Sequence, residues 1–234
     1  MIVEYIPIIT AVFSTYFFVV ILKHYRSNPK PYLLWWTIGV FTFGLGTATE
    51  SINAIVGWSE INFRLWYISG ALLGGFPLAQ GSVYLLTNRK FSTVSTILTI
   101  IVIVIGSICV LLSPISLPPG FENKLTGKIL DWQWVRYFSP FINLYSFIFL
   151  VGGAVYSALK YARQHDKEKR FIGNIFIAIG ALLPGIGGSF TRAGYVNVLF
   201  VTELIGLILI YVGYKVIKND SSISLHSSQM KTVM

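Results

Sequence analysis

Seven long apolar runs, separated by short polar links, constrain this chain more than any other feature of its sequence. They cover residues 6–23, 32–56, 62–88, 93–112, 133–160, 171–190 and 195–217. A helix of about 20 apolar residues crosses a hydrocarbon core of ~30 Å, and each run is long enough to supply one. With 54% hydrophobic and 12% charged residues, the composition excludes a soluble globular fold. The sequence predicts an all-α, polytopic membrane protein, a seven-transmembrane-helix bundle that forms one domain over 1–218.

Basic residues gather on alternate links between these runs, and this pattern predicts the orientation. Lys and Arg, which give the net charge of +9, concentrate at 23–30, 89–90, 160–170 and from 215 onward, whereas acidic residues offset them on the intervening side. An excess of Lys and Arg marks the cytoplasmic side. We therefore expect the amino terminus outside, the carboxyl terminus in the cytoplasm and a multi-pass location in the cell membrane. Attraction to anionic lipid of the bilayer explains the basic excess, so no nucleic-acid partner is expected.

The two ends of the chain and its cysteine content add three expectations. Glu4 stands where a secretory signal would carry basic residues, which predicts that the first run is kept as a helix. The polar, serine-rich residues 219–234 are expected to form a disordered cytoplasmic tail. Cys109 is the only cysteine, so intrachain disulfides and thiolate metal clusters are excluded.

Several familiar chemistries have no residues to support them. The sequence contains no HExxH, GxSxG, Walker A or GxGxxG motif. All three histidines, His24, His165 and His226, belong to the cytoplasmic edge or the tail, so intramembrane zinc or haem sites are not expected. An opsin would need a lysine midway along the last helix, and this one has none before Lys215. We predict no catalytic residue, no metal, no cofactor and no enzymatic activity.

A lone carboxylate in the last apolar run, Glu203, is the most informative polar residue. It lies on the order of 12 Å below the outer end of its helix, at ~1.5 Å per residue. A charged side chain at the helix centre costs about 2.5–3.5 kcal/mol, which favours a position facing the bundle interior or water. Other polar residues are expected at a similar outer depth, with two arginines at the rim: Thr10, Ser14, Thr47, Glu50, Tyr67, Asn143, Arg64 and Arg192.

Together these residues predict an outward-opening polar pocket. Glu50 and Glu203 would hold a cation, an amine or a proton, and Arg64 and Arg192 would neutralise them or bind an anionic part of a ligand. The predicted ligand-binding residues are Glu203, Glu50, Arg64, Arg192, Tyr67, Asn143 and Thr47. The alternative is that Glu50 pairs with Arg64, and Glu203 with Arg192, only to hold helix ends together.

Small residues, prolines and one amide predict how the helices meet. Close approach is expected at the small residues Gly44, Gly46, Gly70, Gly74 and Gly75. Pro77 and Pro184 are expected to break their helices, the second break freeing carbonyls level with Glu203. Gln80 is expected to form hydrogen bonds between helices. The outer loop 113–132 is either an ordered cover over the pocket or a solvated loop.

Four segments resemble a known family. They are RSNPKPY at 26–32, FRLWYISGALL at 63–73, YLLTNRK at 84–90 and GALLPGIGG at 180–188. The order of these features is similar to the seven-helix sensing region of bacterial membrane histidine kinases and to related stand-alone bacterial membrane proteins. The resemblance covers about Ile6 to Lys218 and implies that the helices sense an extracellular or membrane signal. No kinase domain follows Lys218, so a cytoplasmic signalling partner would have to dock on the basic inner links.

Three function classes remain open. The first is a non-enzymatic, receptor-like ligand-binding protein for a small ligand from the outer side. The second is a small-molecule or ion-coupled transporter, which the carboxylates and the two prolines favour. The third is a membrane-embedded, lipid-modifying enzyme with Glu203 or Glu50 as general base, which has the least support because no nucleophile accompanies them.

Overall fold

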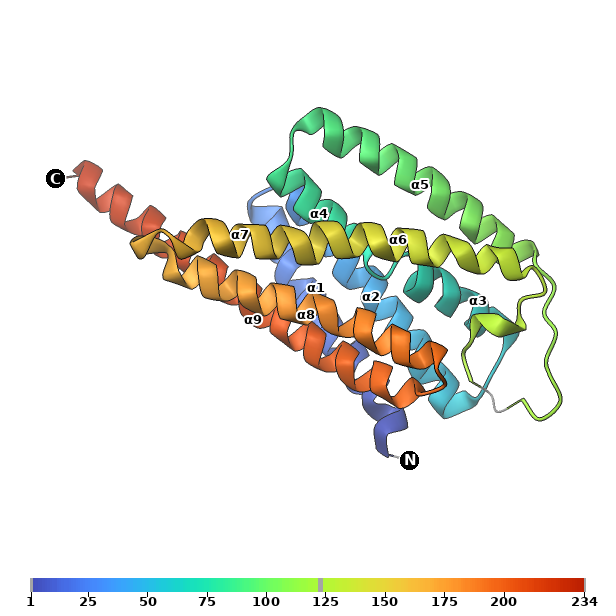
Figure 1. The fold of residues 1–234 in the computed structure, drawn as a ribbon. Coiled ribbons are helices and arrows are strands. Elements are labelled where there is room, and N and C mark those ends of the chain that lie inside the picture. The colour runs from blue at the N-terminus through green and yellow to red at the C-terminus, as the bar shows by residue number, and fades with distance from the viewer. Residues whose placement is uncertain (1, 122–123, 234) are drawn as a thin grey trace. The chain divides into compact units, whose positions relative to one another are not determined.

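The described chain is helical in all its regular elements. The structure is a computed structural model that describes residues 2–121 and 124–233, with the side chains of Ile2, His165, Arg192 and 221–233 left out of that description. It divides into two compact units, Met1–Leu150 and Val151–Met234, which are treated separately below. Figure 1 shows both units as sets of long helices. The all-helical prediction is confirmed.

The helices follow one another with short connections. The first unit contains η1 (Ile2–Tyr5), α1 (Ile6–Ser27), α2 (Pro31–Val56), α3 (Glu60–Trp66), η2 (Tyr67–Leu72), α4 (Phe76–Leu86), α5 (Arg89–Leu112), η3 (Gly127–Ile129), η4 (Gln133–Tyr137) and α6 (Phe138–Ser146). The π-helix η5 (Phe147–Gly152) crosses the boundary, and the second unit continues with α7 (Gly153–Ala162), η6 (His165–Lys167), α8 (Glu168–Arg192) and α9 (Val196–Val233).

Five helices are long and apolar enough to cross a membrane. They cover Val3–Ser27, Arg89–Leu112, Gln133–Ala162, Glu168–Thr191 and Val196–Asp220. This finding is consistent with a multi-pass membrane protein. Two of the seven predicted spans are not among the five. The 26 residues of α2 include many threonines and glycines, which dilute its apolar character, and the run 62–88 is divided between α3, η2 and α4.

Close contacts between small residues hold α2 in the middle of the first unit. It packs against both α1 and α4. Ser14 on α1 donates to the carbonyl of Val40 at 2.9 Å, and a Cβ built on Gly44 would lie 2.7 Å from the Ser14 hydroxyl. A Cβ on Gly46 would lie 3.3 Å from the Cα of Gly70. The close helix approach predicted at these glycines is confirmed.

The third apolar run is interrupted, as the proline in it predicts. After α3, the π-helix η2 ends with Leu73 donating to the carbonyl of Ile68 at 3.0 Å. Residues 73–75 form a turn, and α4 then begins with Pro77 in its first turn, where a missing N–H costs least. The run is therefore two short helices joined by an irregular segment.

Facing glycines bring α8 and α9 of the second unit together. They form what we call the glycine seam, built from Gly173, Gly180 and Gly187 on α8 and from Gly206 and Gly213 on α9. A Cβ on Gly180 would lie 2.6 Å from the carbonyl oxygen of Gly206, and a Cβ on Gly206 would lie 2.6 Å from that of Gly180. The two backbones therefore touch, and no side chain fits between them.

The expected break at Pro184 is wrong, because α8 is continuous from Glu168 to Arg192. Pro184 removes the donor that would normally bond the carbonyl of Gly180. That carbonyl faces Gly206, and a Cβ on Gly206 would also lie 3.0 Å from Cδ of Pro184. The absence of a side chain at residue 206 leaves room for the ring and for the unbonded carbonyl, so α8 keeps its helical course.

A tight turn joins α8 to α9. Gly194 has a φ of +100°, and its N–H bonds the carbonyl of Thr191 at 3.0 Å. Tyr195 donates to the carbonyl of Phe190 at 3.0 Å. This pair of bonds is a Schellman motif, which ends a helix at a glycine in the left-handed region. The backbone of α9 is helical as far as Val233, where the sequence predicts a disordered tail over 219–234; the side chains after Asp220 lie outside the described residues, and that expectation stays a prediction.

Candidate functional site

The first unit buries a carboxylate, that of Glu50 on α2. The residue is 5% exposed, and the indole Nε1 of Trp66 on α3 donates to its Oε1 at 3.1 Å. A buried carboxylate is costly unless hydrogen-bond donors compensate it, so Trp66 is one of the groups that stabilise Glu50 there. A tryptophan indole can only donate, which suits it to this acceptor.

The polar residues around Glu50 are bonded to backbone carbonyls. Thr47 is 2% exposed and donates to the carbonyl of Gly44 at 3.2 Å, while Ser51 donates to the carbonyl of Thr47 at 2.8 Å. Asn62 at the start of α3 donates to the carbonyl of Thr49 at 2.9 Å, which links the two helices. These hydroxyl and amide groups hold α2 and α3 in place beside the carboxylate.

The Trp66 ring that bonds the buried carboxylate packs against a second aromatic ring, that of Tyr67. Tyr67 is 4% exposed, and its ring centroid lies 6.1 Å from that of Trp66. We call Thr47, Glu50, Trp66 and Tyr67 the Glu50 cluster. A carboxylate beside the faces and edges of aromatic rings is the chemistry that recognises organic cations. The sequence predicted Thr47, Glu50 and Tyr67 as site residues and missed Trp66.

Arg64 is placed at the end of α5 and does not reach Glu50 among the described residues. Its guanidinium bonds Glu60 at 2.6 and 3.0 Å, and it donates to the carbonyls of Val110, Leu111 and Ser113. These carbonyls lie at the carboxyl end of α5, where a cation is favoured by the helix dipole and by the unsatisfied carbonyl groups. The pair of Glu50 with Arg64 considered from the sequence is therefore not formed.

Asn143 lies outside the Glu50 cluster. Its side chain is exposed on α6, and its Nδ2 donates to the hydroxyl of Ser139 at 3.3 Å. Ser139 in turn donates to the carbonyl of Ala71 at 3.0 Å and so joins α6 to η2, just before the interruption of the third run. Within the first unit, Asn143 supports a helix contact rather than a buried site.

The remaining predicted site residues belong to the second unit. Glu203 is half-buried on α9, one turn before Gly206 of the glycine seam. Arg192 is the last residue of α8, and its side chain lies outside the described part of the chain. Because Glu50 and Glu203 belong to different units, their sharing one pocket stays a prediction.

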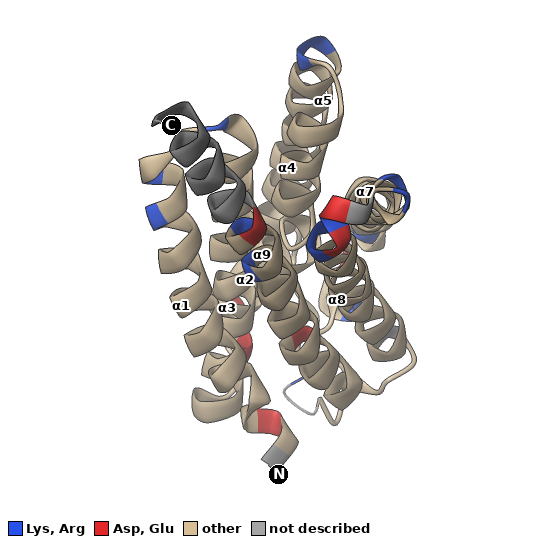
Figure 2. Ribbon diagram, turned by 90° about the vertical axis from the view of Figure 1, so that its left-hand side faces the viewer, with Lys and Arg blue, Asp and Glu red and all other residues tan. Residues whose placement is uncertain are grey.

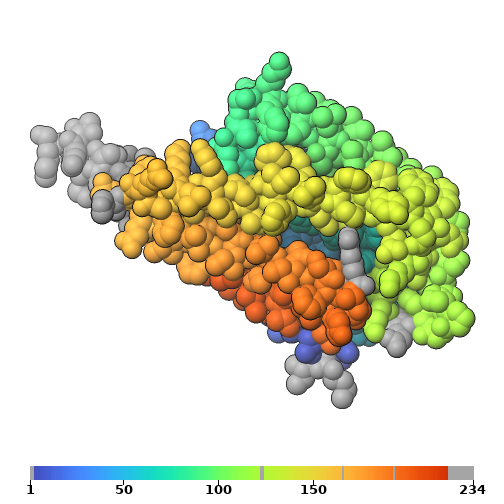
Figure 3. Space-filling view, in the orientation of Figure 1, coloured from blue at the N-terminus to red at the C-terminus, as the bar shows by residue number. Residues whose placement is uncertain are grey.

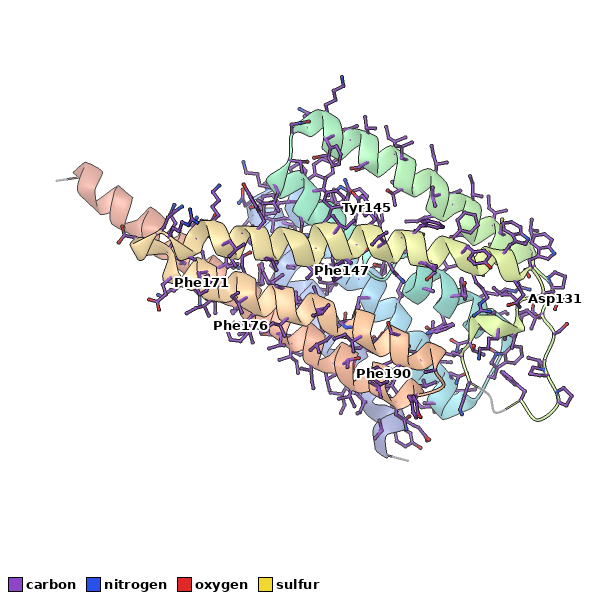
Figure 4. The ribbon with its side chains drawn as sticks, in the orientation of Figure 1. Asp131, Tyr145, Phe147, Phe171, Phe176 and Phe190 are labelled. Atoms are coloured by element: carbon purple, nitrogen blue, oxygen red, sulfur yellow. The ribbon has the colours of Figure 1, made fainter. Side chains whose placement is uncertain are left out.

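The outer loop is ordered over the residues that the structure describes, 113–121 and 124–132. Its two arms meet at a β-bridge between Ile115 and Leu130, and the backbone N–H of Asp131 donates to the carbonyl of Pro114 at 3.0 Å. Asp131 lies at the far end of the first unit in Figure 4, and Figure 3 shows the yellow-green atoms of this segment massed over that end. A Cβ on Gly127 would lie 2.7 Å from the ring of Tyr67. The loop is therefore ordered and packs against Tyr67, and its role as a cover over a pocket stays a prediction.

Loop residues also belong to the hydrophobic core of this end of the unit. Leu125, Ile129 and Leu130 are all at most 7% exposed and pack in one cluster with Phe63 and Tyr67. Burying large apolar side chains stabilises a segment by about 1.5–3 kcal/mol for each. The loop is therefore held by packing, and not only by its backbone hydrogen bonds.

A second polar cluster lies around Gln80, which is fully buried on α4. Its Nε2 is 3.0 Å from the carbonyl of Ser92 and 2.7 Å from the hydroxyl of Thr96, and its Oε1 accepts from the Tyr145 hydroxyl at 2.5 Å. Tyr145 extends from α6 toward α4 and α5 (Figure 4). The predicted interhelical role of Gln80 is confirmed, whereas its partners could not be identified from the sequence.

Among the described residues, no group of three or more His, Cys, Asp or Glu side chains could hold a metal ion. The Glu50 cluster provides one buried carboxylate, two aromatic rings and an ordered loop packed against one of them. No protein-family model, no curated protein and no solved structure matches this chain.

Proposed function

We propose that this chain is a receptor-like, non-enzymatic membrane protein that binds a small organic amine from the outer side at the Glu50 cluster. The observation that carries the proposal is the buried carboxylate of Glu50, which accepts a hydrogen bond from Trp66, whose ring packs against that of Tyr67. A protonated amine would gain a charge-assisted hydrogen bond to the carboxylate and cation–π contacts with the rings. Glu203 and Arg192 belong to the second unit, and their part in ligand binding stays a separate prediction.

The proposed topology is seven crossings, with the amino terminus outside and the carboxyl terminus in the cytoplasm of the cell. It is supported by the charges of the first unit. Figure 2 shows basic residues at the carboxyl end of α1 and at the turn between α4 and α5, both at the end of the unit away from the start of α1. That end would be cytoplasmic. A signalling partner would dock on these basic links, in keeping with the resemblance to kinase sensing regions.

The interrupted third run favours a transporter as the second candidate. Transporters often place substrate sites at discontinuous helices, whose exposed backbone groups contact the substrate. Residues 73–75 interrupt the run between η2 and α4. The other expected break is missing, since α8 continues through Pro184. The transport reading therefore retains one of its two structural arguments.

We favour binding over lipid-modifying catalysis because the hydroxyl groups near Glu50 are already engaged in hydrogen bonds to the backbone. Those of Thr47 and Ser51 donate to backbone carbonyls of α2, which leaves neither oriented as a nucleophile toward a substrate. Hydrolysis or acyl transfer on a lipid would require a nucleophile or an activated water beside the general base.

The test is thermal stability of the purified full chain in detergent across a panel of primary, tertiary and quaternary amines. A ligand that binds only the native state at 100 times its Kd adds about 2.7 kcal/mol of stability. We expect the gain to disappear in Glu50→Gln and to remain in Glu168→Gln, whose carboxylate is exposed. Glu203→Gln tests the second carboxylate separately. Equal gains in Glu50→Gln and in the native chain would reject the Glu50 cluster as the site, and uptake of the same amine into liposomes would instead support transport.

A further inference from the structure

The first unit has an open groove of about 460 Å³ along one side, between α2 and α5. We call it the lateral groove. Trp35 and Ile38 of α2 form one wall, Ile103 and Ser107 of α5 belong to the other, and Phe76 with neighbouring residues at the start of α4 forms the floor. Glu50 lies about 18 Å further along α2 than Ile38, at ~1.5 Å per residue. No residue of the Glu50 cluster lines the lateral groove.

The way α5 is attached explains why a groove remains. Near its amino end, Ser92 and Thr96 accept hydrogen bonds from Gln80 of α4. At its carboxyl end, Arg64 bonds the last carbonyls. Between these two attachments, the third run is interrupted at residues 73–75, so no continuous helix fills the space between α5 and α2.

The lining of the lateral groove is chemically uniform. Apart from the Ser107 hydroxyl and the indole N–H of Trp35, its side chains are hydrocarbon. A water molecule needs two to four polar partners to be held in a cavity, and this lining does not supply them along most of its length. The rings of Trp35 and Phe76 meet edge to face, with their centroids 5.7 Å apart, and both present apolar surface to the groove. The groove suits a flexible hydrocarbon chain better than water or a polar ligand.

The rim of the lateral groove is continuous with a surface that faces lipid if α5 crosses the membrane. Arg89–Leu112 is one of the five helices long and apolar enough to do so. Val104 and Ile108 line the groove and are each 50% exposed, and Ile101 beside them on α5 is also 50% exposed but outside the groove. The mouth of the groove therefore opens onto the apolar surface that α5 would present to the bilayer.

We propose that the lateral groove binds one acyl chain of a bilayer phospholipid. The apolar lining, the open side and the position on a membrane-type helix identify the occupant as a hydrocarbon chain, and the bilayer supplies phospholipid acyl chains around every such helix. A bound chain would fill the space between α5 and α2 and would stabilise α5 between its two attachments.

The first experiment measures retained lipid by native mass spectrometry of the full chain released from phospholipid-containing detergent micelles. We expect one phospholipid per chain for the native sequence and for Ile101→Phe, and at least a fivefold loss of that species for Ser107→Phe, which fills the groove. Val104→Phe narrows the groove from its half-exposed rim and serves if Ser107→Phe does not fold. Equal retention in all four proteins would overturn the proposal. A lipid-free dimer that Ser107→Phe dissociates would also overturn it, since a second copy would then occupy the groove.

The second experiment locates the chain within the groove. Vesicles of phospholipid with brominated acyl chains quench nearby tryptophans, and the difference between the native chain and Trp35→Phe isolates the quenching of Trp35. We expect this difference to fall at least twofold in Ser107→Phe and to be unchanged in Ile101→Phe. Unchanged Trp35 quenching in Ser107→Phe would place the lipid elsewhere. Neither readout uses an amine ligand, so failure of the proposed function would leave this test intact.

Discussion

The two units of this protein hold their helices together in different ways. In the first, α4, α5 and α6 are joined by buried side chains: Gln80 bonds Ser92, Thr96 and Tyr145, and Arg64 bonds the end of α5. In the second, α8 and α9 meet through backbone contacts at the glycine seam. Side-chain hydrogen bonds can join helices that are short, bent or apart, whereas a glycine seam requires two straight helices in a fixed register. In the first unit the run 62–88 is interrupted at residues 73–75, whereas α8 in the second unit is continuous.

The two prolines show the same difference. Pro77 follows Gly74 and Gly75 and starts a new helix, so the third run is interrupted. Pro184 lies within α8, where Gly206 opposite leaves room for its ring. Pro184 is therefore accommodated within a continuous helix because a glycine lies opposite it on α9.

The largest effect is expected from a side chain in the glycine seam. Gly180→Leu would place its Cβ 2.6 Å from the carbonyl of Gly206, and backbone atoms cannot give way as a side chain does. Overpacking of this kind costs about 1–3 kcal/mol or more, so we expect the second unit to lose its paired helices. Thermal unfolding in detergent would measure it. Gly185→Leu is the matched control, because a Cβ at residue 185 meets nothing within 4 Å. Equal stability of the two variants would mean that the seam does not hold α8 and α9.

Substitutions in the polar cluster around Gln80 should lower the free energy of unfolding by less than Gly180→Leu does, and those at Gln80 and Tyr145 should not be additive. Gln80→Leu leaves the Tyr145 hydroxyl without its acceptor, and a lost buried partner costs about 1–3 kcal/mol. Tyr145→Phe removes the donor, and the double variant should be less destabilised than the sum of the two, with a coupling of about 0.5–3 kcal/mol. Unfolding in denaturant would measure all three. Tyr137→Phe, on a tyrosine that is 69% exposed, should change little. Strict additivity would show that the hydrogen bond does not stabilise the unit.

The hydrogen bonds from Arg64 to the last carbonyls of α5 should stabilise the end of that helix more than the ion pair between Arg64 and Glu60 does. Arg64→Gln removes the bonds to the carbonyls of Leu111 and Ser113, and a cation at a helix end is worth about 0.3–1 kcal/mol, up to ~2 when partly buried. Glu60→Gln removes only a partner that is 56% exposed, which is worth at most about 1 kcal/mol. Hydrogen exchange of the last turn of α5 would separate them. Faster exchange in Glu60→Gln than in Arg64→Gln would contradict the capping role.

The smallest loss of stability is expected from breaking the salt bridge between Arg170 and Asp220 in the second unit. Arg170 bonds Asp220 at 2.9 Å, joining the start of α8 to α9, with both side chains partly exposed. A pair of this kind contributes about 0–1 kcal/mol and is weakened by salt. Asp220→Asn should lower the melting temperature slightly at low ionic strength and not at 1 M salt. A loss as large as that from Gly180→Leu would show that the second unit also depends on side-chain bonds.

Helical character and close helix approach could be predicted from the sequence because both depend on local composition. Long apolar runs predict helices, and Gly44 and Gly46 allow contact whatever the neighbour is. The partners could not be predicted, since they depend on how distant segments pack. A pair of Arg64 with Glu50 was one alternative from the sequence, but Arg64 instead bonds Glu60 and the last carbonyls of α5, which the sequence does not show to be nearby. Trp66 was missed because only the packing of α3 beside α2 brings its indole N–H to Glu50.

The tight turn at Gly194 has a consequence for how the protein is made. Only the residues around it separate α8 from α9, and the Schellman motif fixes the direction in which the chain reverses. If both helices cross the bilayer, so short a connection does not allow one of them to enter the lipid while the other stays far away in the translocon. We expect α8 and α9 to leave the translocon as a preassembled hairpin, with Gly180 and Gly206 already in contact before lipid surrounds them.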